Sequence, residues 1–287
     1  MVMQSITQPL ISQILPPRSD NADKLGFGKL MCICGNYNMP GAAVLSVGGA
    51  LRSGAGLVTI ASCESVCRSV NYAYPGAVLK ILPKDEDGGI NPDAVFDFLS
   101  ADTLSHYSAL LFGCGIGITR GGAAALKSLI ENCTAPLIID ADGLNLLAED
   151  MSLLKKAKCP VILTPHEREL ARLLKDANLN SAQVLANAYG VTVISKGPVT
   201  QIFGEKNYIL NAPNSALAKG GSGDILAGLI AGLSAQGVSP CDAAAVGVYI
   251  HSRAGALASE MHSARACLVT DILDEIGIAF AEIEEEE

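Results

Sequence analysis

The 287-residue chain contains no tryptophan and only four histidines, and aromatic residues make up 5% of it. This composition argues against a binding groove built from aromatic rings, while 29 glycines favour tight packing of the backbone. Gly, Ser or a charged residue interrupts each apolar stretch before it reaches membrane-spanning length, and the chain does not open with a basic segment followed by an apolar run. We therefore expect no transmembrane helix, no secretory signal and no membrane partner, and we expect a cytoplasmic protein.

An excess of basic residues is also lacking, because the formal net charge is −9 at pH 7. Five of these negative charges belong to Glu282, Glu284, Glu285, Glu286 and Glu287, so the rest of the chain carries only −4. Such a chain is not expected to present a basic face that binds nucleic acid. We expect the acidic tail, residues 282–287, to be a solvated fringe.

The cysteines do not have the spacing of a disulfide framework, and their number is odd. None of the four histidines lies next to a cysteine pair, so a zinc site is not expected. We interpret the cysteines as small buried hydrophobic residues in a reducing cytosol. They are Cys32, Cys34, Cys63, Cys67, Cys114, Cys133, Cys159, Cys241 and Cys267.

Short runs of β-branched residues alternate with amphipathic segments along most of the chain. This alternation predicts a single α/β domain over residues 1–287, with a mostly parallel central sheet and helices on both faces. Strands are expected at Lys29–Cys34, Leu57–Ala61, Ala109–Phe112, Pro136–Asp140, Val161–Thr164 and Val191–Ser195. Helices are expected at Pro40–Ser53, Ala123–Glu131, Glu167–Lys175, Asp224–Ser234 and Cys241–Ser259, with a helix and turn near the N-terminus and a hairpin-like piece around Tyr208–Leu210.

Several predicted strands end in a glycine or a polar residue. Gly35, Gly113, Asp140, Thr164 and Lys196 each stand at the carboxyl end of one of these strands. In open α/β sheets, ligands bind at that edge. The sequence therefore predicts a ligand site where these five strand ends meet.

The strongest local motif is the segment from Lys219 to Asp224, which contains three glycines and directly precedes an apolar helical pattern. Glycines allow backbone N–H groups to converge, and the start of a helix adds partial positive charge, so this loop is suited to hold an anion. A carboxylate beside a phosphate would repel it unless it acts as a base toward an attacking hydroxyl, which is the role we expect for Asp224. The alternative is an ordinary glycine-rich turn with an aspartate in the first helical turn.

Three further segments follow predicted strands. The segment Asp140–Asn145 places two carboxylates after an apolar strand, which suits a hydrated Mg²⁺ ion or ribose-like hydroxyls, but helix capping by Asp142 explains the pattern equally well. Gly35–Ala42 is either a second close approach of backbone to a ligand or a simple strand-to-helix turn. Gly113–Gly117 resembles a dinucleotide-binding motif only superficially, because no matching final glycine or ribose-binding acid follows.

Two side chains at the same predicted edge carry nitrogen. His166 stands at a predicted helix start, where the helix dipole disfavours the imidazolium, so we expect a neutral hydrogen-bonding group. Lys196–Thr200 leaves a strand with a flexible cation and a turn, which suits contact with a phosphate or an adenine ribose. A structural histidine and a plain hairpin turn are the alternatives.

Taken in order, these segments resemble the ADP/ATP-dependent NAD(P)H-hydrate dehydratase family of the ribokinase-like superfamily. The resemblance runs from about residue 25 to residue 260. The Gly-x-Gly-Asp end is typical of the whole superfamily, whereas Gly-Ala-Gly-Leu-Val-Thr and Asp-Ala-Asp-Gly-Leu-Asn point to the dehydratase branch. The matching segments are Gly35–Ala42, Arg52–Thr59, Asp140–Asn145, Thr164–Glu169 and Gly220–Asp224.

The resemblance implies roles for individual residues. It implies that Asp224 is catalytic and that, with Ala42, Gly117 and His166, it contacts the hydrated nicotinamide nucleotide. It assigns the adenine nucleotide to Lys196, Gly197, Pro198, Val199, Thr200, Gly220, Gly221, Ser222 and Gly223, and it leaves the metal ligands unknown. Two departures stand out, because Glu167-Arg168 replaces the Pro-Gly that often follows the histidine in the family, and Lys219 precedes the glycines.

The implied reaction is the ADP-dependent dehydration of (6S)-NADHX or NADPHX to NADH or NADPH, with release of AMP and phosphate. Mg²⁺ is the implied cofactor, ATP is the alternative donor, and a homo-oligomer, specifically a tetramer, is expected. Because the motifs begin near residue 27, we expect a stand-alone dehydratase without the epimerase domain to which many members are fused. The main alternative is a vitamin or sugar kinase of the same superfamily, which would share Asp224 and the loop but release a stable phosphate ester. A nucleotide-sensing module would not need the carboxylate.

Overall fold

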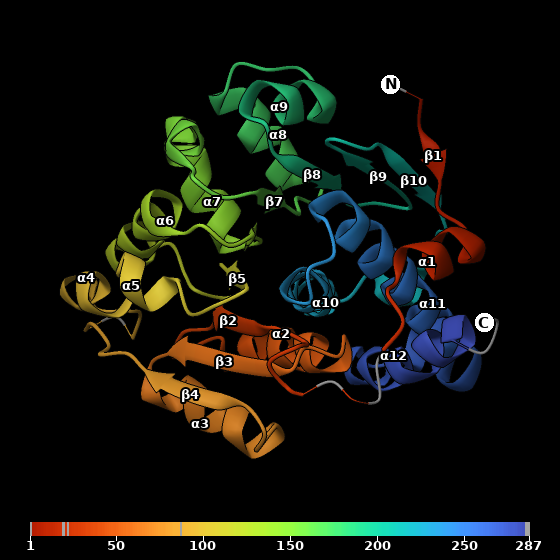
Figure 1. Cartoon of the computed structure of the whole chain (residues 1–287), viewed down its shortest axis with the longest axis horizontal. Coiled ribbons are helices and arrows are strands. Elements are labelled where there is room, and N and C mark those ends of the chain that lie inside the picture. Colours follow the sequence, from red (N-terminus) through yellow and green to blue (C-terminus); the bar gives the residue numbers. More distant parts are fainter. Residues whose placement is uncertain (1, 19–20, 22, 87, 285–287) are drawn as a thin grey trace.

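The chain forms a ten-stranded sheet in the computed structural model, which describes residues 2–18, 21, 23–86 and 88–284 (Figure 1). The strands are β1 (Gln4–Ser5), β2 (Lys29–Ile33), β3 (Leu57–Ser62), β4 (Val78–Ile81), β5 (Ala109–Phe112), β6 (Leu137–Ile139), β7 (Val161–Leu163), β8 (Thr192–Ser195), β9 (Val199–Phe203) and β10 (Tyr208–Asn211). Their spatial order is β1-β10-β9-β8-β7-β6-β5-β2-β3-β4. Strand β9 runs antiparallel to β8 and β10, and the other neighbours are parallel.

Helices cover both faces of the sheet (Figure 1). One face carries α1 (Gln8–Ile14), α2 (Pro40–Arg52), α3 (Glu64–Ala73), α10 (Ser222–Ala235), α11 (Pro240–Ala266) and α12 (Val269–Glu284). The other carries α4 (Val95–Phe98), α5 (Ala101–Leu104), α6 (Arg120–Asn132), α7 (Asp142–Glu149), α8 (Glu167–Asp176) and α9 (Ala182–Tyr189). Successive residues of β2 point to opposite faces, so Leu30 and Cys32 belong to the first core and Met31 and Ile33 to the second.

Helix α10 is buried along nearly its whole length and packs closely against α2. Glycines make this approach possible, since a methyl group at Gly228 would overlap the carbonyl oxygen of Ser46, and one at Gly49 would overlap that of Ile225. A helix that is apolar all round belongs in the interior of a protein. This packing fixes where the first turn of α10 lies relative to the sheet.

The predicted α/β class and the mostly parallel sheet are confirmed, and the six predicted strands are present with ends within one residue of those expected. The N-terminal helix and the piece around Tyr208–Leu210 are also present, as α1 and as β10 paired with β9. The cysteines are free thiols, and all except Cys159 are buried, as their interpretation as small hydrophobic residues requires. The predicted elements did not include strands β1 and β4 or helices α3, α4, α5, α9 and α12.

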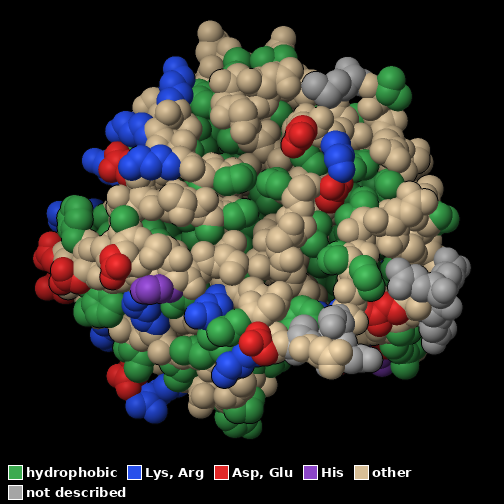
Figure 2. Space-filling view, viewed as in Figure 1, with side chains coloured by type: hydrophobic (Ala, Val, Ile, Leu, Met, Phe, Trp, Pro, Cys, Tyr) green, Lys and Arg blue, Asp and Glu red, His purple; other side chains and the backbone are tan. Residues whose placement is uncertain are grey.

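The prediction that the acidic tail is a solvated fringe is wrong for Glu282. Helix α12 continues to Glu284, and the guanidinium of Arg253 donates from Nε and Nη2 to the two Glu282 carboxylate oxygens, each at 2.7 Å. Glu285–Glu287 lie outside the described residues. In the described part of the chain, no helix combines the length and the apolar character that crossing a bilayer requires. Basic and acidic side chains are interspersed on the face of the molecule in Figure 2.

Replacing Gly228 with alanine should lower the free energy of unfolding by about 1–3 kcal/mol, because the added methyl group forces α10 away from α2. Chemical denaturation measures this change. Gly76→Ala is the control, since a methyl group there meets no atom within 4 Å and the change should stay within ~0.5 kcal/mol. Equal stability of the two variants would show that the glycine does not limit the approach of the helices.

Candidate active site

The carboxyl ends of five adjacent parallel strands, in the order β8-β7-β6-β5-β2, meet at one edge of the sheet, as the sequence predicts. Chain order reverses between β2 and β5, because β3 and β4 extend from one side and β6 to β8 from the other. Crevices at such reversals are where open α/β sheets bind ligands. Here the loop that follows β2 and the loop that follows β5 are in contact, because the Gly35 N–H donates to the Cys114 carbonyl oxygen at 2.8 Å.

The glycine-rich loop forms the start of α10 at this edge. Gly221 has φ +93°, a left-handed conformation that glycine adopts without strain, and Ser222 begins the helix. The Ser222 hydroxyl lies 3.0 Å from Nε2 of His251, a buried residue of α11. Burial lowers the pKa of His251 to about 4, so this imidazole is neutral and holds the loop without adding charge.

A cavity of about 740 Å³ opens beside the start of α10. This volume lies within the range of small-molecule sites. Of the residues predicted to bind ligands, those that line it are His166, Lys196, Gly197, Pro198, Thr200, Ser222 and Gly223. Val199, the first residue of β9, and Gly220 and Gly221 of the glycine-rich loop are not among its lining residues. The cavity is also lined by Lys219, whose ammonium donates to the Ala264 carbonyl at 3.1 Å.

A buried ion pair joins the ends of β6 and β8. The Lys196 ammonium donates to Asp140 Oδ1 at 2.8 Å, and the side chains are 18% and 2% exposed. Burial alone would lower the pKa of Lys196, but the carboxylates of Asp140 and Glu169 outweigh it and raise this pKa. Lys196 is therefore a fixed cation in the lining of the cavity, and a Cβ on Gly223 would lie 3.3 Å from its Nζ.

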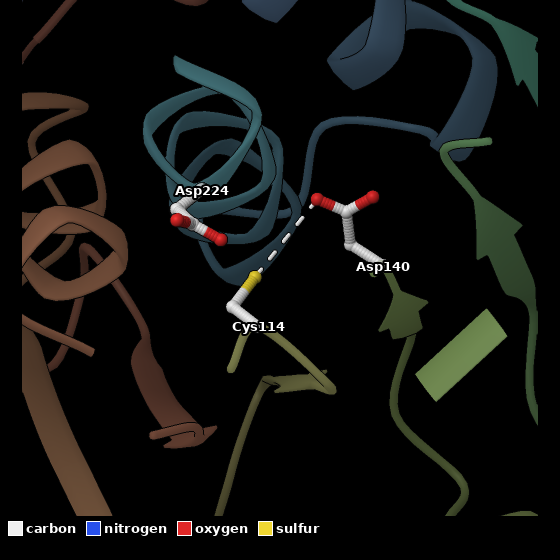
Figure 3. Close-up of side chains that lie close together, drawn as sticks. All are labelled: Cys114, Asp140 and Asp224. Carbon is white, nitrogen blue, oxygen red and sulfur yellow. Dashed lines mark hydrogen bonds between the residues drawn. The ribbon is translucent and has the colours of Figure 1, made fainter. Parts of the chain in front are cut away.

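Asp224 lies next to this pair, in a cluster with Cys114 and Asp140 (Figure 3). One thiol or carboxylate atom from each residue lies within 4.8 Å of the others. Burial, together with the negative charge of Asp140, raises the pKa of Asp224 to about 7. A carboxylate with such a pKa can accept a proton near neutral pH, which is the property required of a general base.

The predicted contacts to the substrate lie on two sides of this cluster. Ala42 and Gly117 lie on the side of β2 and β5. A Cβ on Gly115 would lie 2.6 Å from the Cβ of Ala42. The Gly117 N–H donates to Asp142 Oδ2 at 2.9 Å. His166 instead lines the cavity on the β7–β8 side. The structure therefore does not bring His166 together with Ala42 and Gly117 in one wall.

His166 occupies the helix start that the sequence predicts. It caps α8, because its Nδ1 accepts hydrogen bonds from the N–H groups of Arg168 and Glu169. Burial and the charge of Lys196 lower the pKa of His166, which agrees with the expected neutral imidazole. The main causes of the lowered pKa are therefore burial and Lys196, and not the helix dipole alone. Glu167-Arg168 form the first turn of α8.

The acidic cluster does not fit a Mg²⁺ ion held by protein groups alone. Asp140 is already paired with Lys196, the Cys114 thiol is a soft ligand, and Asp142 accepts from Gly117. Mg²⁺ prefers oxygen ligands, and it is usually held by one or two carboxylates together with the phosphates of a substrate. The alternative of an Asp142 side-chain cap is also not observed, because α7 has no side-chain hydrogen bond at its cap and Asp142 stands inside its first turn.

His251 and Cys114 were not among the residues predicted to form the site. His251 is a single histidine in an apolar helix, and no local pattern connects it with Ser222. Cys114 follows β5 inside the Gly113–Gly117 segment, so its place at the ligand edge could have been predicted from the strand alone.

A family model described as NAD(P)H-hydrate dehydratase matches residues 30–277. The chain is also similar to the bifunctional NAD(P)H-hydrate repair enzyme of Moorella thermoacetica, with 33% identity over 281 residues that cover 95% of the chain and 53% of the relative. It thus spans about half the length of the curated relatives it matches.

Solved structures agree with this match. The ADP/ATP-dependent NAD(P)H-hydrate dehydratase of Bacillus subtilis, co-crystallised with ATP/Mg²⁺, is 27% identical with a TM-score of 0.83 over 99% of both chains. A ribokinase-like superfamily protein of Enterococcus faecalis has a TM-score of 0.81 at 24% identity, covering 98% of this chain and 96% of its own. The expected ribokinase-like fold is confirmed.

Asp224→Asn should stabilise the protein at pH 8. Folding raises the pKa of the Asp224 carboxyl from 3.8 to about 7. Such a group stabilises the fold fully at a pH below its unfolded pKa, and this contribution is lost as the pH rises through its folded pKa. We expect the variant to gain about 1–3 kcal/mol at pH 8 and clearly less at pH 5, measured by urea denaturation. Asp97→Asn, at an exposed site on α4, should change stability by less than ~0.5 kcal/mol at both pH values. A gain that does not grow with pH would contradict the raised pKa.

Proposed function

Because the chain belongs to the NAD(P)H-hydrate dehydratase family, we propose that it dehydrates (6S)-NADHX and NADPHX to NADH and NADPH, with ADP as phosphoryl donor and AMP and phosphate as products. The observation that carries this proposal is the position of Asp224. It stands in the first turn of α10, beside a cavity of about 740 Å³ and next to the fixed cation of Lys196.

In this proposal the adenine nucleotide occupies the cavity. The turn Lys196–Thr200 and the loop Gly220–Gly223 supply a cation, backbone N–H groups and a helix start, which together suit a diphosphate. The hydrated nicotinamide would enter from the side of Ala42 and Gly117, so that its hydroxyl lies between Asp224 and the terminal phosphate. His166 would contact the substrate only where the two binding sites meet.

The chemistry follows from the poor leaving ability of hydroxide. Asp224 accepts the proton of the ring hydroxyl while the oxygen attacks the terminal phosphorus of ADP, and AMP leaves. The amides of the Gly220–Gly223 loop stabilise the charge on the transferred group. The ring nitrogen then expels phosphate from the neighbouring carbon, and loss of a ring proton restores the dihydronicotinamide.

Several finer features are part of the proposal. Mg²⁺ would arrive with the nucleotide and supply charge neutralisation on its phosphates, since the acidic cluster does not fit the ion alone. The co-crystals of the Bacillus subtilis dehydratase contain ATP/Mg²⁺, so ATP is the alternative donor to test. We also propose a single ribokinase-like domain, a cytoplasmic location and a homotetramer. Sedimentation analysis would measure the mass of the assembly.

Asp224→Asn tests the base directly. The amide keeps the shape of the side chain but cannot take a proton, so turnover should fall by ~10²–10⁴-fold. Calorimetric binding of ADP and of the hydrate should change by less than about threefold. In the wild type, the rate should fall as pH drops below about 7, because protonation removes the base. Near-normal turnover of the variant would exclude Asp224 as the base.

The same assay separates the dehydratase from a kinase. Chemically hydrated NADH is incubated with Mg²⁺ and either ADP or ATP, and both the absorbance of restored NADH and free phosphate are followed. A dehydratase yields both products in equal amounts. A stable phosphorylated small molecule, with no gain in NADH, would assign this chain to the kinase branch.

Gly223→Val tests the nucleotide side. The Cβ would sit 3.3 Å from Lys196 Nζ and 3.7 Å from Asp140 Oδ2, and the two added methyl groups would enter the space assigned to phosphate. ADP affinity should fall at least ~10-fold while the melting temperature changes little. Gly220→Ala is the control, since a methyl group there meets no atom within 4 Å. Unchanged ADP affinity in a folded Gly223→Val protein would remove the loop from the site.

A further inference from the structure

A further cavity, of about 560 Å³, opens at the same carboxyl edge of the sheet. Its lining comes from α4 and from the segments that follow three neighbouring parallel strands, β2, β3 and β4, so we call it the β2–β4 cavity. Its volume lies within the range of small-molecule sites, and the steps of the proposed reaction use none of its residues. Five of the lining residues are Tyr37 after β2, Glu64 and Arg68 of α3, Lys84 after β4, and Phe98 of α4.

The loop that follows β2 connects this cavity with the predicted substrate contacts. Tyr37 lies in the Gly35–Ala42 segment, whose last residue is one of those contacts. The preceding residue, Asn36, lies against Gly117, since a Cβ on Gly117 would be 2.9 Å from Asn36 Nδ2. The Tyr37 N–H donates to the Gly88 carbonyl oxygen at 3.2 Å, which fixes the loop beside the segment that follows β4. A ligand in contact with Gly117 therefore lies close to the β2–β4 cavity.

The proposed substrate extends well beyond the ring that is dehydrated. NADHX and NADPHX are dinucleotides, in which a pyrophosphate joins the hydrated nicotinamide nucleoside to an adenosine. In the proposed arrangement ADP fills the cavity beside α10, on the side of β8, so the adenosine of the substrate needs a different place. The β2–β4 cavity stands on the opposite side of the predicted substrate contacts from β8, and it is therefore open to this half of the dinucleotide.

The lining of the β2–β4 cavity suits a purine base. Tyr37 is 61% exposed and Phe98 is half-buried, so two aromatic rings are available to a ligand in a chain that has few of them. Aromatic rings stack on the faces of nucleic acid bases. Each ring also has a lysine beside it. The Lys84 Nζ lies 5.8 Å from the centroid of the Tyr37 ring, and the Lys80 Nζ lies 5.6 Å from that of Phe98. Rings next to positive charge suit a base whose ribose carries phosphate.

The charges of the lining favour an additional phosphate group. The Arg68 guanidinium donates from Nε and Nη2 to Glu64 Oε1, at 3.0 and 2.6 Å, so these two charges balance. Lys84 makes no ion pair with any residue that the structure describes, and it gives the lining a net positive charge. In dinucleotide-binding folds a carboxylate binds the free 2′-hydroxyl of the adenosine ribose, whereas an arginine accommodates a 2′-phosphate. Glu64 and Arg68 offer both groups, and Lys84 adds the charge that a phosphate needs.

We propose that the β2–β4 cavity binds the adenosine half of the dinucleotide substrate, with the base against Tyr37 and Phe98, and that Lys84 and Arg68 recognise the 2′-phosphate that distinguishes NADPHX from NADHX. This inference rests on the proposed function for the identity of the dinucleotide. It predicts that the protein accepts both hydrates and binds the phosphorylated one more tightly.

Lys84→Met removes the positive charge and keeps the length of the side chain. The unreactive dinucleotides NAD⁺ and NADP⁺ report binding without turnover, and saturating ADP fills the cavity beside α10. ADP that also entered the β2–β4 cavity would weaken both dinucleotides by the same factor and leave their ratio unchanged. By calorimetry, the wild type should bind NADP⁺ about 3–10-fold more tightly than NAD⁺, and Lys84→Met should lose most of this preference. Added salt should reduce the preference of the wild type.

Two further variants complete the set. Tyr37→Leu removes a ring from the cavity, so the affinities for NAD⁺ and NADP⁺ should both fall about 5–10-fold while their ratio stays as in the wild type. Lys158→Met is the control for the loss of charge, because Lys158 is an exposed lysine near the amino end of β7, at the opposite edge of the sheet. It should leave both affinities unchanged.

Binding and turnover keep the two proposals separate. If the wild type dehydrates neither hydrate but Lys84→Met lowers the ratio of affinities, the cavity binds the 2′-phosphate and the proposed function fails. If both hydrates are converted and Lys84→Met leaves the ratio unchanged, the proposed function stands and this inference is overturned. An equal fall of the ratio in Lys158→Met, or an unchanged affinity for both dinucleotides in Tyr37→Leu, would overturn it as well.

Discussion

The close packing of α10 against α2 is the constraint on which the candidate site depends. Gly228 and Gly49 remove the side chains that would hold the two helices apart, and the buried helix has no room to slide. Its first turn is therefore fixed at the carboxyl edge of the sheet, with the positive end of its dipole, Ser222 and Gly223 beside the cavity. A mobile loop of the same composition would have to be ordered by each ligand, at a cost in affinity.

That fixed position also sets the electrostatics of the cluster. Helix α10 places Asp224 close to Asp140. Because Asp140 is buried and Asp224 is partly buried, water screens the two carboxyl groups from each other only weakly. Lys196 neutralises Asp140 through a direct hydrogen bond, which leaves Asp224 as the group that responds to a proton near neutral pH. The fold thus keeps a destabilised carboxylate at the place where a base is useful, and stability and activity are opposed at this residue.

The class of fold and the edge that carries the site could be predicted from the sequence, because both depend on local patterns. Apolar runs define β2 and β5 to β8, and the glycine or polar residue that follows each strand marks its carboxyl end. The pairing of Lys196 with Asp140 could not be predicted, since it joins residues 56 positions apart and depends on the strand order. The contact between Ser222 and His251 could not be predicted either, because these residues are 29 positions apart in the sequence. The tail prediction failed because α12 is held by an ion pair to α11, which a run of glutamates does not reveal.

The two sides of the site are joined through one short segment. Asp140 binds Lys196 on the side of the cavity, and Asp142 accepts from Gly117 on the side of Ala42. Ala141 between them has φ +50°, a conformation that an alanine adopts only when its surroundings hold it there. Both carboxylates are occupied by protein groups, so the segment is suited less to binding a ligand directly than to fixing the distance between the Lys196–Thr200 turn and the Gly113–Gly117 segment. The proposed phosphoryl transfer needs that distance to be right, because the attacking oxygen and the phosphorus must be in contact before a base can act.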